Sequence, residues 1–298
     1  MLKSLISKAL PFIPKNLVHA FAQKYVAGET LEDGLKVVED LNSKNIWATM
    51  DLLGEFVSDR KRAEQATQAA MDNLEAIHKK NLRSGISTKL TSQGLDIDDD
   101  YCYGNLKKLV EKAKAVDRFV RIDMENSPYT TRTLNQYRKL RAEGFENTGI
   151  VLQAYMRRSE EDLKSLLALK PDVRLCKGIY REDAAIAFKG REEVQANYKK
   201  LLTYMFDNDF HAAIATHDDV LLDFARETIA KRSVAKDRYE FQMLLGVRDN
   251  KRDELVKDGH KVRVYVPYGE DWYGYSMRRL KENPEIAAHI LKAVISRE

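Results

Sequence analysis

Two adjacent arginines lie near the end of the chain, in the stretch YGYSMRRLKE at residues 273–282. On a helix, the 100° step between residues would place four polar side chains of this stretch within about a third of the circumference. They are Tyr275, Arg278, Arg279 and Glu282. Two planar guanidinium groups match the oxygens of a carboxylate, and an i,i+4 pair of Arg278 with Glu282 would hold one of them in place. Since adjacent arginines also occur on solvated helix faces, the stretch alone leaves a carboxylate clamp and a charged surface as alternatives.

Further polar side chains follow short apolar stretches that are typical of strands. Lys89 and Asp123 end two successive stretches, and an ion pair between them would stabilise the charged form of each. Gln153 and Gln242 end two others, and an amide can donate and accept hydrogen bonds at once, which suits a polar heterocycle. A structural ion pair and hydrogen bonds to the backbone are the competing interpretations.

The stretch RLCKGIY places Arg174 and Lys177 beside Gly178, where the lack of a side chain lets the backbone approach a ligand closely. Cys176 stands between the two cations. A strand end with a solvated lysine explains the same pattern without a ligand.

Thr216 and His217 lie in ATHDDV, at the junction of an expected strand and helix. The N-terminus of a helix suits an anion because its backbone N–H groups are unpaired. The alternative is that Thr216 or Asp218 caps the helix.

These residues must be positioned by regular elements, and eight short stretches rich in β-branched and aromatic residues alternate with helical patterns. The stretches are 45–53, 85–90, 118–125, 148–155, 173–178, 211–217, 239–245 and 261–268. Alternation of this kind predicts a parallel sheet, and eight units close naturally into a distorted (β/α)8 TIM-type barrel over residues 45–298. An open doubly wound sheet is the alternative, but no GxGxxG turn is present. Residues 1–44 would form an N-terminal helical arm.

Alternation along each strand separates an apolar set, which would face the helices, from a polar set, which would face the barrel axis. The polar set comprises Lys89, Arg121, Asp123, Gln153, Arg174, Glu240, Gln242, Arg263 and Tyr265. Buried charges are costly unless paired, so these groups should bind one another or a polar ligand. Several lie at the carboxyl ends of their strands, where barrel enzymes place their sites, and this position favours an enzyme.

Bulk composition excludes several classes of protein. The 50 basic and 46 acidic residues nearly cancel, which gives no general argument for nucleic-acid binding. Cys102 and Cys176 lack CxxC spacing, so we expect no disulfide framework and no metal site, and the cytoplasm is the simplest location. The sequence contains no run of about 18 apolar residues, so it predicts no membrane-spanning helix. The first 21 residues form an amphipathic pattern that would pack on the domain or touch a membrane.

Taken together, the motifs resemble the flavin-dependent proline dehydrogenases in their monofunctional bacterial form. The resemblance covers most of the chain from about residue 45 onward and lies in ordered stretches, each weak alone. They are DLLGE, STKLTSQGLDID, RIDME, RLCKGIY, ATHDD, YEFQML, RVYVPYG and YGYSMRRLKEN.

That resemblance implies a barrel with noncovalently bound FAD at its carboxyl-terminal face, oxidising L-proline to Δ1-pyrroline-5-carboxylate by hydride transfer to flavin N5. Arg278 and Arg279 would hold the proline carboxylate. The other residues implied to enclose the substrate are Lys89, Asp123, Tyr180, Leu244, Tyr265 and Tyr275. The flavin-site residues implied are Gln153, Arg174, Cys176, Lys177, Gly178, Thr216, His217, Gln242 and Glu282, the last bracing the arginine pair. Cys176 replaces the aliphatic residue usual in the family.

The resemblance also implies partners. Electrons would pass to a membrane quinone, so a cytoplasmic protein in peripheral contact with the membrane is expected, and a separate pyrroline-5-carboxylate dehydrogenase would take the product. Two rival hypotheses remain at this point. A barrel enzyme forming a Schiff base would use Lys89 or Lys177 as its amine, and a catalytically silent barrel would serve as a binding scaffold.

Overall fold

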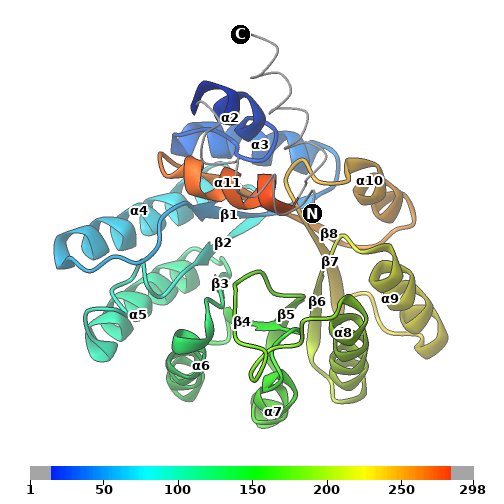
Figure 1. The fold of residues 1–298 in the computed structure, drawn as a ribbon. Coiled ribbons are helices and arrows are strands. Elements are labelled where there is room, and N and C mark those ends of the chain that lie inside the picture. The colour runs from blue at the N-terminus through cyan, green and yellow to red at the C-terminus, as the bar shows by residue number, and fades with distance from the viewer. Residues whose placement is uncertain (1–14, 283–298) are drawn as a thin grey trace, which may run out of the picture.

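Eight parallel strands form a closed barrel in the computed structural model, which describes residues 15–282. Each strand pairs with its neighbour in the sequence, and β8 closes the ring against β1, as Figure 1 shows with the helices around it. The predicted (β/α)8 barrel is therefore confirmed. Among residues 15–282, no helix combines the length and the hydropathy that crossing a membrane requires.

Each of the eight predicted stretches overlaps one strand, and β2 and β5 begin one residue before the stretch that predicts them. The strands are β1 Trp47–Leu52, β2 Ser84–Thr88, β3 Val120–Ile122, β4 Thr148–Gln153, β5 Asp172–Cys176, β6 His211–Ala215, β7 Tyr239–Leu244 and β8 Val262–Tyr268. The predicted ends were too long by several residues at β3, which ends before Asp123 because the chain turns away towards the next helix. The Asp123 N–H nevertheless donates to the Thr88 carbonyl at 2.9 Å, so this carboxylate stays fixed to the strand edge.

Helices cover the outside of the barrel. They are α2 Lys15–Ala22, α3 Leu31–Ser43, α4 Arg60–Lys79, α5 Asp99–Ala115, α6 Ser127–Ala142, α7 Ser159–Lys164, α8 Arg191–Asp207, α9 Asp219–Arg232, α10 Asp249–Lys257 and α11 Trp272–Glu282, with a 3₁₀ turn at Leu167–Leu169. Aspartates begin several of them: Asp59 accepts from the Arg62 N–H and Asp98 from the Tyr101 N–H. Such caps satisfy backbone donors that a helix leaves unpaired, and they fix where each helix leaves its loop.

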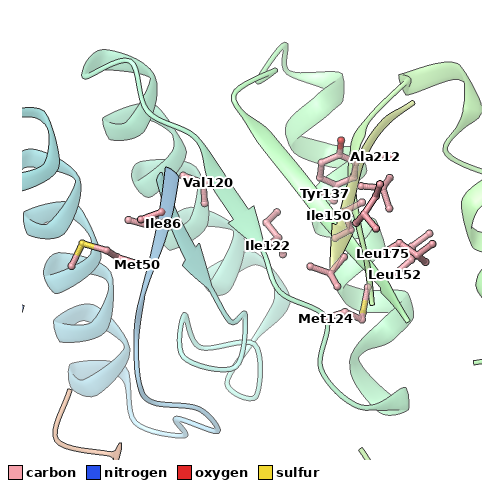
Figure 2. Packing of buried hydrophobic residues seen from close by; sticks show 14 of the residues in the cluster. Met50, Ile86, Val120, Ile122, Met124, Tyr137, Ile150, Leu152, Leu175 and Ala212 are labelled. Atoms are coloured by element: carbon pink, nitrogen blue, oxygen red, sulfur yellow. The ribbon is translucent and has the colours of Figure 1, made fainter. Parts of the chain in front are cut away.

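Apolar side chains on the outer face of the strands form the main core. Val120, Ile122 and Ile150 are completely buried against the surrounding helices, as are the three valines of β8. Figure 2 shows this layer between strands and helices, with Tyr137 of α6 reaching into it. The predicted outward set is confirmed, and burial of this layer supplies the main favourable term for closing the barrel.

Ion pairs fill the inside of the barrel, as the polar alternation predicted. Near the amino-terminal end, Arg121 Nη2 lies 2.5 Å from Asp172 Oδ1, and the Asp172 carboxylate also lies 3.0 Å from His211 Nδ1. Gly149 leaves room for this pair, because a Cβ there would lie 2.5 Å from Arg121 Nη1. Arg263 and Glu240 form a second pair at 2.6 Å.

The described part of the N-terminal arm lies along the barrel. Helix α2 packs against α11, and α3 packs against β1 and β8, an arrangement visible in Figure 1. His19 and Trp272 bring their rings to 4.9 Å across the first of these contacts. Residues 1–14, where the amphipathic pattern begins, lie outside the described residues.

Candidate active site

Lys89 lies just beyond β2, at the carboxyl end of the barrel. Its Nζ is 2.9 Å from Asp51 Oδ2 and 3.8 Å from Asp123 Oδ2. The expected pair with Asp123 is present, but Asp51 of β1, the neighbouring strand on the other side of β2, is the closer partner. Burial opposes the charge on Lys89, yet the two carboxylates outweigh burial and raise its pKa, so the side chain is an ammonium at neutral pH.

Tyr265 of β8 joins this group from the other side of β1. Its hydroxyl donates to Asp123 Oδ2 at 3.3 Å and lies 3.5 Å from Lys89 Nζ. Burial raises the pKa of Tyr265, so the phenol stays neutral and keeps its hydrogen for Asp123. Residues in or directly after four strands, β1, β2, β3 and β8, thus meet at one point.

Arg174 of β5 is the centre of a second group inside the barrel mouth. Its Nη1 lies 2.8 Å from Asp123 Oδ1, and both terminal nitrogens lie 3.2 Å from the Ser87 hydroxyl. Its guanidinium also lies 5.5 Å from the centre of the Tyr265 ring. The two groups are therefore connected through Asp123.

Gln242 links Arg174 to the charges deeper in the barrel. Its Oε1 accepts from Arg174 Nε at 2.5 Å, and its Nε2 donates to Glu240 Oε1 at 2.6 Å. Glu240 in turn receives two bonds from Arg263, at 2.6 and 3.0 Å. Because a carboxylate only accepts, Glu240 fixes which end of the Gln242 amide faces Arg174.

Four sequence-predicted residues lie where β4 and β5 end. Gln153 Nε2 donates to the Met124 carbonyl at 3.1 Å, and Lys177 Nζ lies 3.1 Å from Asp218. Cys176 Sγ lies 3.7 Å from the Leu152 carbonyl, and burial raises the pKa of its thiol to about 11. Gly178 has a φ of 103°, and a Cβ there would meet the Tyr155 ring at 2.1 Å, so the tight turn after β5 requires glycine.

The junction of β6 and α9 contains Thr216 and His217. Asp218 caps α9 by accepting from the Val220 N–H, and Thr216 Oγ1 accepts from the Asp218 N–H. Capping by Asp218, one of the two alternatives, is therefore present, and a ligand role for Thr216 and His217 stays a prediction.

His217 is a neutral acceptor inside the site. Its Nε2 accepts from the Leu244 N–H at 2.9 Å, which places the ring hydrogen on Nδ1. Burial, together with the positive charges of Arg279, Lys177 and Arg248, lowers the pKa of His217 to about 4.

Helix α11 brings the two arginines to the mouth of the barrel. Arg279 is 8% exposed and lies over the Tyr275 ring at 5.3 Å, while Tyr275 packs against Tyr25, Val26 and Leu53. Tyr275 and Arg279 are therefore buried, so their side of α11 is not a purely solvated face.

Arg278 is held by a residue of another loop. Its Nη1 lies 2.7 Å from Glu55 Oε1, in the loop that follows β1. The expected brace was Glu282, the last residue of α11, whose side chain lies outside the described residues.

Two adjoining cavities open at the mouth. The smaller, of about 280 Å³, is lined by Lys89 and Arg278, with Tyr275 also in its wall. The larger, of about 570 Å³, continues between α4 and the strands β1 and β2. Leu53, Gly54 and Glu55 line both, so the loop after β1 forms the wall between them.

Tyr180 is half-buried, and burial, Glu55 and Glu125 raise its pKa.

The family model for proline dehydrogenase matches residues 34–290. The chain belongs to the proline dehydrogenase family. It is 39% identical over 276 residues to proline dehydrogenase 1 of Bacillus subtilis strain 168, covering 93% of this chain and 91% of that protein. It is 35% identical over 278 residues to proline dehydrogenase of Deinococcus radiodurans, covering 92% and 90%.

A solved structure agrees with this assignment. The proline utilization A protein of Bdellovibrio bacteriovorus, inactivated by N-propargylglycine, superposes with a TM-score of 0.84 at 25% identity. The match covers 89% of this chain and 33% of that longer one. The fold and the family thus agree in identifying this chain as an enzyme of the proline dehydrogenase family.

Proline dehydrogenases depend on a flavin, and the donor groups around β4 to β7 fit such a ring. A flavin edge alternates carbonyl oxygens and ring nitrogens with one N–H, and the Gln153 and Gln242 amides together with the Arg174 guanidinium offer both kinds of partner. Within residues 15–282, no group of three or more His, Cys, Asp or Glu side chains is arranged to hold a metal ion.

Sequence reasoning missed several residues of this candidate site. Ser87 and Glu55 were given no role, and Asp51 was not recognised as the nearest partner of Lys89. Glu55 stands in the DLLGE stretch directly after β1, so its position beyond a strand end was the available signal. Its contact with Arg278 spans 223 positions, which no local pattern reveals.

Proposed function

We propose that this enzyme oxidises L-proline to Δ1-pyrroline-5-carboxylate with noncovalently bound FAD as the hydride acceptor. The observation that carries the proposal is the smaller cavity, whose lining includes the two cationic side chains Lys89 and Arg278. A small amino acid bearing a carboxylate suits such a volume, because it brings the negative charge that these cations require.

Arg278 and Arg279 hold the carboxylate of proline in this proposal. Glu55 takes one nitrogen of Arg278 and leaves the rest of the guanidinium for a ligand. Arg279, packed on Tyr275, has few rotamers left, so little entropy is lost when the carboxylate binds. A ligand held at one end in this way reacts faster because its reacting carbon is already positioned.

The pyrrolidine ring lies among the remaining substrate residues. Tyr275 and the Lys89, Asp123 and Tyr265 group form the walls, with Tyr180 and Leu244 completing the enclosure. The ion pair of Lys89 with Asp123 and the hydrogen bond from Tyr265 to Asp123 keep these side chains in single orientations. A rigid pocket of this kind excludes water from the reacting carbon.

FAD, when bound, supplies the acceptor for the hydride. Gln153, Arg174 and Gln242 hold its ring in this proposal. The other residues proposed for the flavin site are Cys176, Lys177, Gly178, Thr216 and His217. Arg174 keeps a positive charge next to the ring, which stabilises added electron density. Glu282, at the end of α11, braces the arginine pair in this proposal.

The electrons leave to a membrane quinone, so the protein is cytoplasmic and touches the membrane surface. The match across 91% of the Bacillus subtilis relative supports a monofunctional enzyme. Its product therefore passes to a separate pyrroline-5-carboxylate dehydrogenase.

A Schiff base on Lys89 is disfavoured. Such chemistry needs an uncharged amine, and enzymes obtain it by lowering the lysine pKa. Asp51 and Asp123 raise the pKa of Lys89 instead, against the effect of burial.

The proposal is tested by mixing the flavin-loaded protein with L-proline and an artificial electron acceptor, then measuring the molecular mass of the product. We expect a product that is two hydrogens lighter than proline, formed only when protein and acceptor are both present. A purified protein that takes up no flavin, or that leaves proline unchanged, contradicts the proposal.

A further inference from the structure

The loop between β1 and α4 is tied to a residue that the proposed chemistry does not use. The Phe56 N–H donates to Thr91 Oγ1 at 2.9 Å, and the Val57 N–H donates to the Thr91 carbonyl at 3.1 Å. Thr91 is completely buried just beyond β2. Two consecutive backbone groups of the loop therefore depend on one threonine.

Phe56 adopts a backbone conformation that phenylalanine rarely takes. Its φ is 59°, and 46% of its surface is exposed although it is a large apolar residue. A left-handed conformation is strained for a bulky residue and persists only where neighbouring contacts enforce it. The two bonds to Thr91 are the contacts that enforce it here.

Glu125 determines the orientation of the Thr91 hydroxyl. It is completely buried, its Oε2 accepts from Thr91 Oγ1 at 2.6 Å, and its Oε1 accepts from the Thr91 N–H at 3.1 Å. A hydroxyl has one hydrogen, and since Thr91 gives it to Glu125, a lone pair remains for the Phe56 N–H. Burial raises the pKa of Glu125 to about 7, so this arrangement is kept at a cost in stability.

The tied loop carries a wall of the substrate cavity. Glu55, directly before Phe56, lies 2.7 Å from Arg278, and Leu53 and Gly54 line the cavity beside it. A change in the Phe56 backbone would move the Glu55 Cα and with it the carboxylate that orients Arg278. The path from Glu125 to Arg278 thus runs through Thr91, Phe56 and Glu55.

We infer that Thr91 and Glu125 are positioning residues for the carboxylate-binding arginine, acting by fixing the backbone of residues 55–57. The inference rests on the proposed function, because it takes Arg278 to bind the substrate carboxylate. Neither residue touches the cavity ligand in this account. They act on it through the loop alone.

The test compares Thr91→Val, which keeps the shape and removes the hydroxyl, with Thr91→Ser, which keeps the hydroxyl. Two quantities are measured on the flavin-loaded protein. One is hydrogen exchange of the Phe56 amide, and the other is the Kd of tetrahydrofuran-2-carboxylate, a proline analogue with oxygen in place of the amine. Glu125→Gln is a second variant, since its amide offers one acceptor where Thr91 presents two donors.

We expect Thr91→Val to speed exchange of the Phe56 amide and to weaken the analogue about tenfold, the effect of one lost hydrogen bond. Thr91→Ser should stay within about threefold of wild type in both, and Glu125→Gln should follow Thr91→Val. Unchanged exchange and unchanged affinity in Thr91→Val overturn the inference, as does faster exchange without any loss of affinity. A wild-type protein that binds no analogue contradicts the proposed function instead, while the exchange data still report on the loop.

Discussion

The two ends of the barrel use the same kinds of residue for different purposes. At the amino-terminal end, Arg121 lies 2.5 Å from Asp172, and backbone carbonyls take further bonds from the same guanidinium. At the carboxyl-terminal mouth, Arg278 has its carboxylate partner 2.7 Å away, yet 34% of its side chain stays exposed and it faces a cavity. Charge alone therefore does not separate a structural arginine from a binding one, whereas an adjoining cavity does.

The physical reason lies in what each end must exclude. Arg121 is closed in by a carboxylate and carbonyl oxygens and lines neither of the two cavities described above, so we expect it to contribute to stability alone. A guanidinium beside a cavity keeps donors that a ligand can use. We therefore expect substitutions at the amino-terminal end to lower stability and those at the mouth to lower ligand binding.

The largest effect is expected for Arg121→Met. Removing this cation leaves the Asp172 carboxylate without its main partner inside the barrel, which should cost about 3 to 5 kcal/mol of unfolding free energy. Urea denaturation measures it. Arg232→Met is the matched control, since Arg232 pairs with Asp207 on the surface and should cost less than about 1 kcal/mol. A loss of less than about 1 kcal/mol for Arg121→Met would show that the pair carries little of the fold.

A substitution at the mouth should act on binding. Arg279→Met is expected to keep the flavin and to raise the KM for proline about 100-fold, because charge-assisted hydrogen bonds to a carboxylate are lost. Steady-state kinetics give the KM and absorbance gives the flavin content. Arg279→Lys keeps the positive charge but loses the planar guanidinium, so its KM should lie between the KM values of wild type and Arg279→Met. An unchanged KM in Arg279→Met would remove Arg279 from the clamp.

His217 and Asp172 provide a comparison of the two ends in pH dependence. Burial and nearby cations lower the pKa of His217 to about 4, so its contribution to stability is present above about 6.5 and is lost as pH falls towards 4. Between pH 7 and 5, wild type should lose about 2 kcal/mol more than His217→Gln. Burial opposes ionisation of Asp172, but Arg121 and His211 outweigh it and lower its pKa to about 2, so its contribution should hold over this range. Equal slopes for wild type and variant would contradict the assignment.

The smallest effect is expected at Cys176. Its thiol is kept protonated by burial, lies 3.7 Å from the Leu152 carbonyl and packs against the apolar core, so Cys176→Val should keep the flavin and change the unfolding free energy by less than about 1.5 kcal/mol. Flavin absorbance and urea denaturation provide the check. Loss of the flavin in this variant would show that the sulfur itself is required.

The fold followed from the sequence because each strand has a local signal. Period-two alternation placed Val120 and Ile122 on the outer face and Arg121 on the inner face. In the structure the first two belong to the apolar core, whereas Arg121 pairs with Asp172 of β5. Strand ends were less certain, since Asp123 is hydrogen-bonded like a strand residue but belongs to no strand. The identity of polar partners could not be predicted, because β2 has a neighbouring strand on each side with a carboxylate near Lys89, and only the structure shows that Asp51 lies closer than Asp123.

Contacts distant in sequence were beyond any local pattern. Glu55 and Arg278 meet because α11 returns to the loop after β1, and a pairing rule for helices proposed Glu282 instead. Thr91 and Glu125 were passed over for a similar reason. Neither residue stands out in the sequence. Their positioning role follows only from the hydrogen bond between them and from the bond of Thr91 to the Phe56 backbone, which the structure shows.

The most direct test of the account is an anaerobic absorbance titration of the purified protein with L-proline, carried out in parallel on wild type and Arg279→Met. The account predicts that the oxidised flavin band of wild type disappears as proline is added. In the variant the same bleaching should require about 100-fold more proline. Persistence of the oxidised band in wild type, or identical titration curves for the two proteins, would contradict the claim that the mouth of the barrel holds proline by its carboxylate against a flavin.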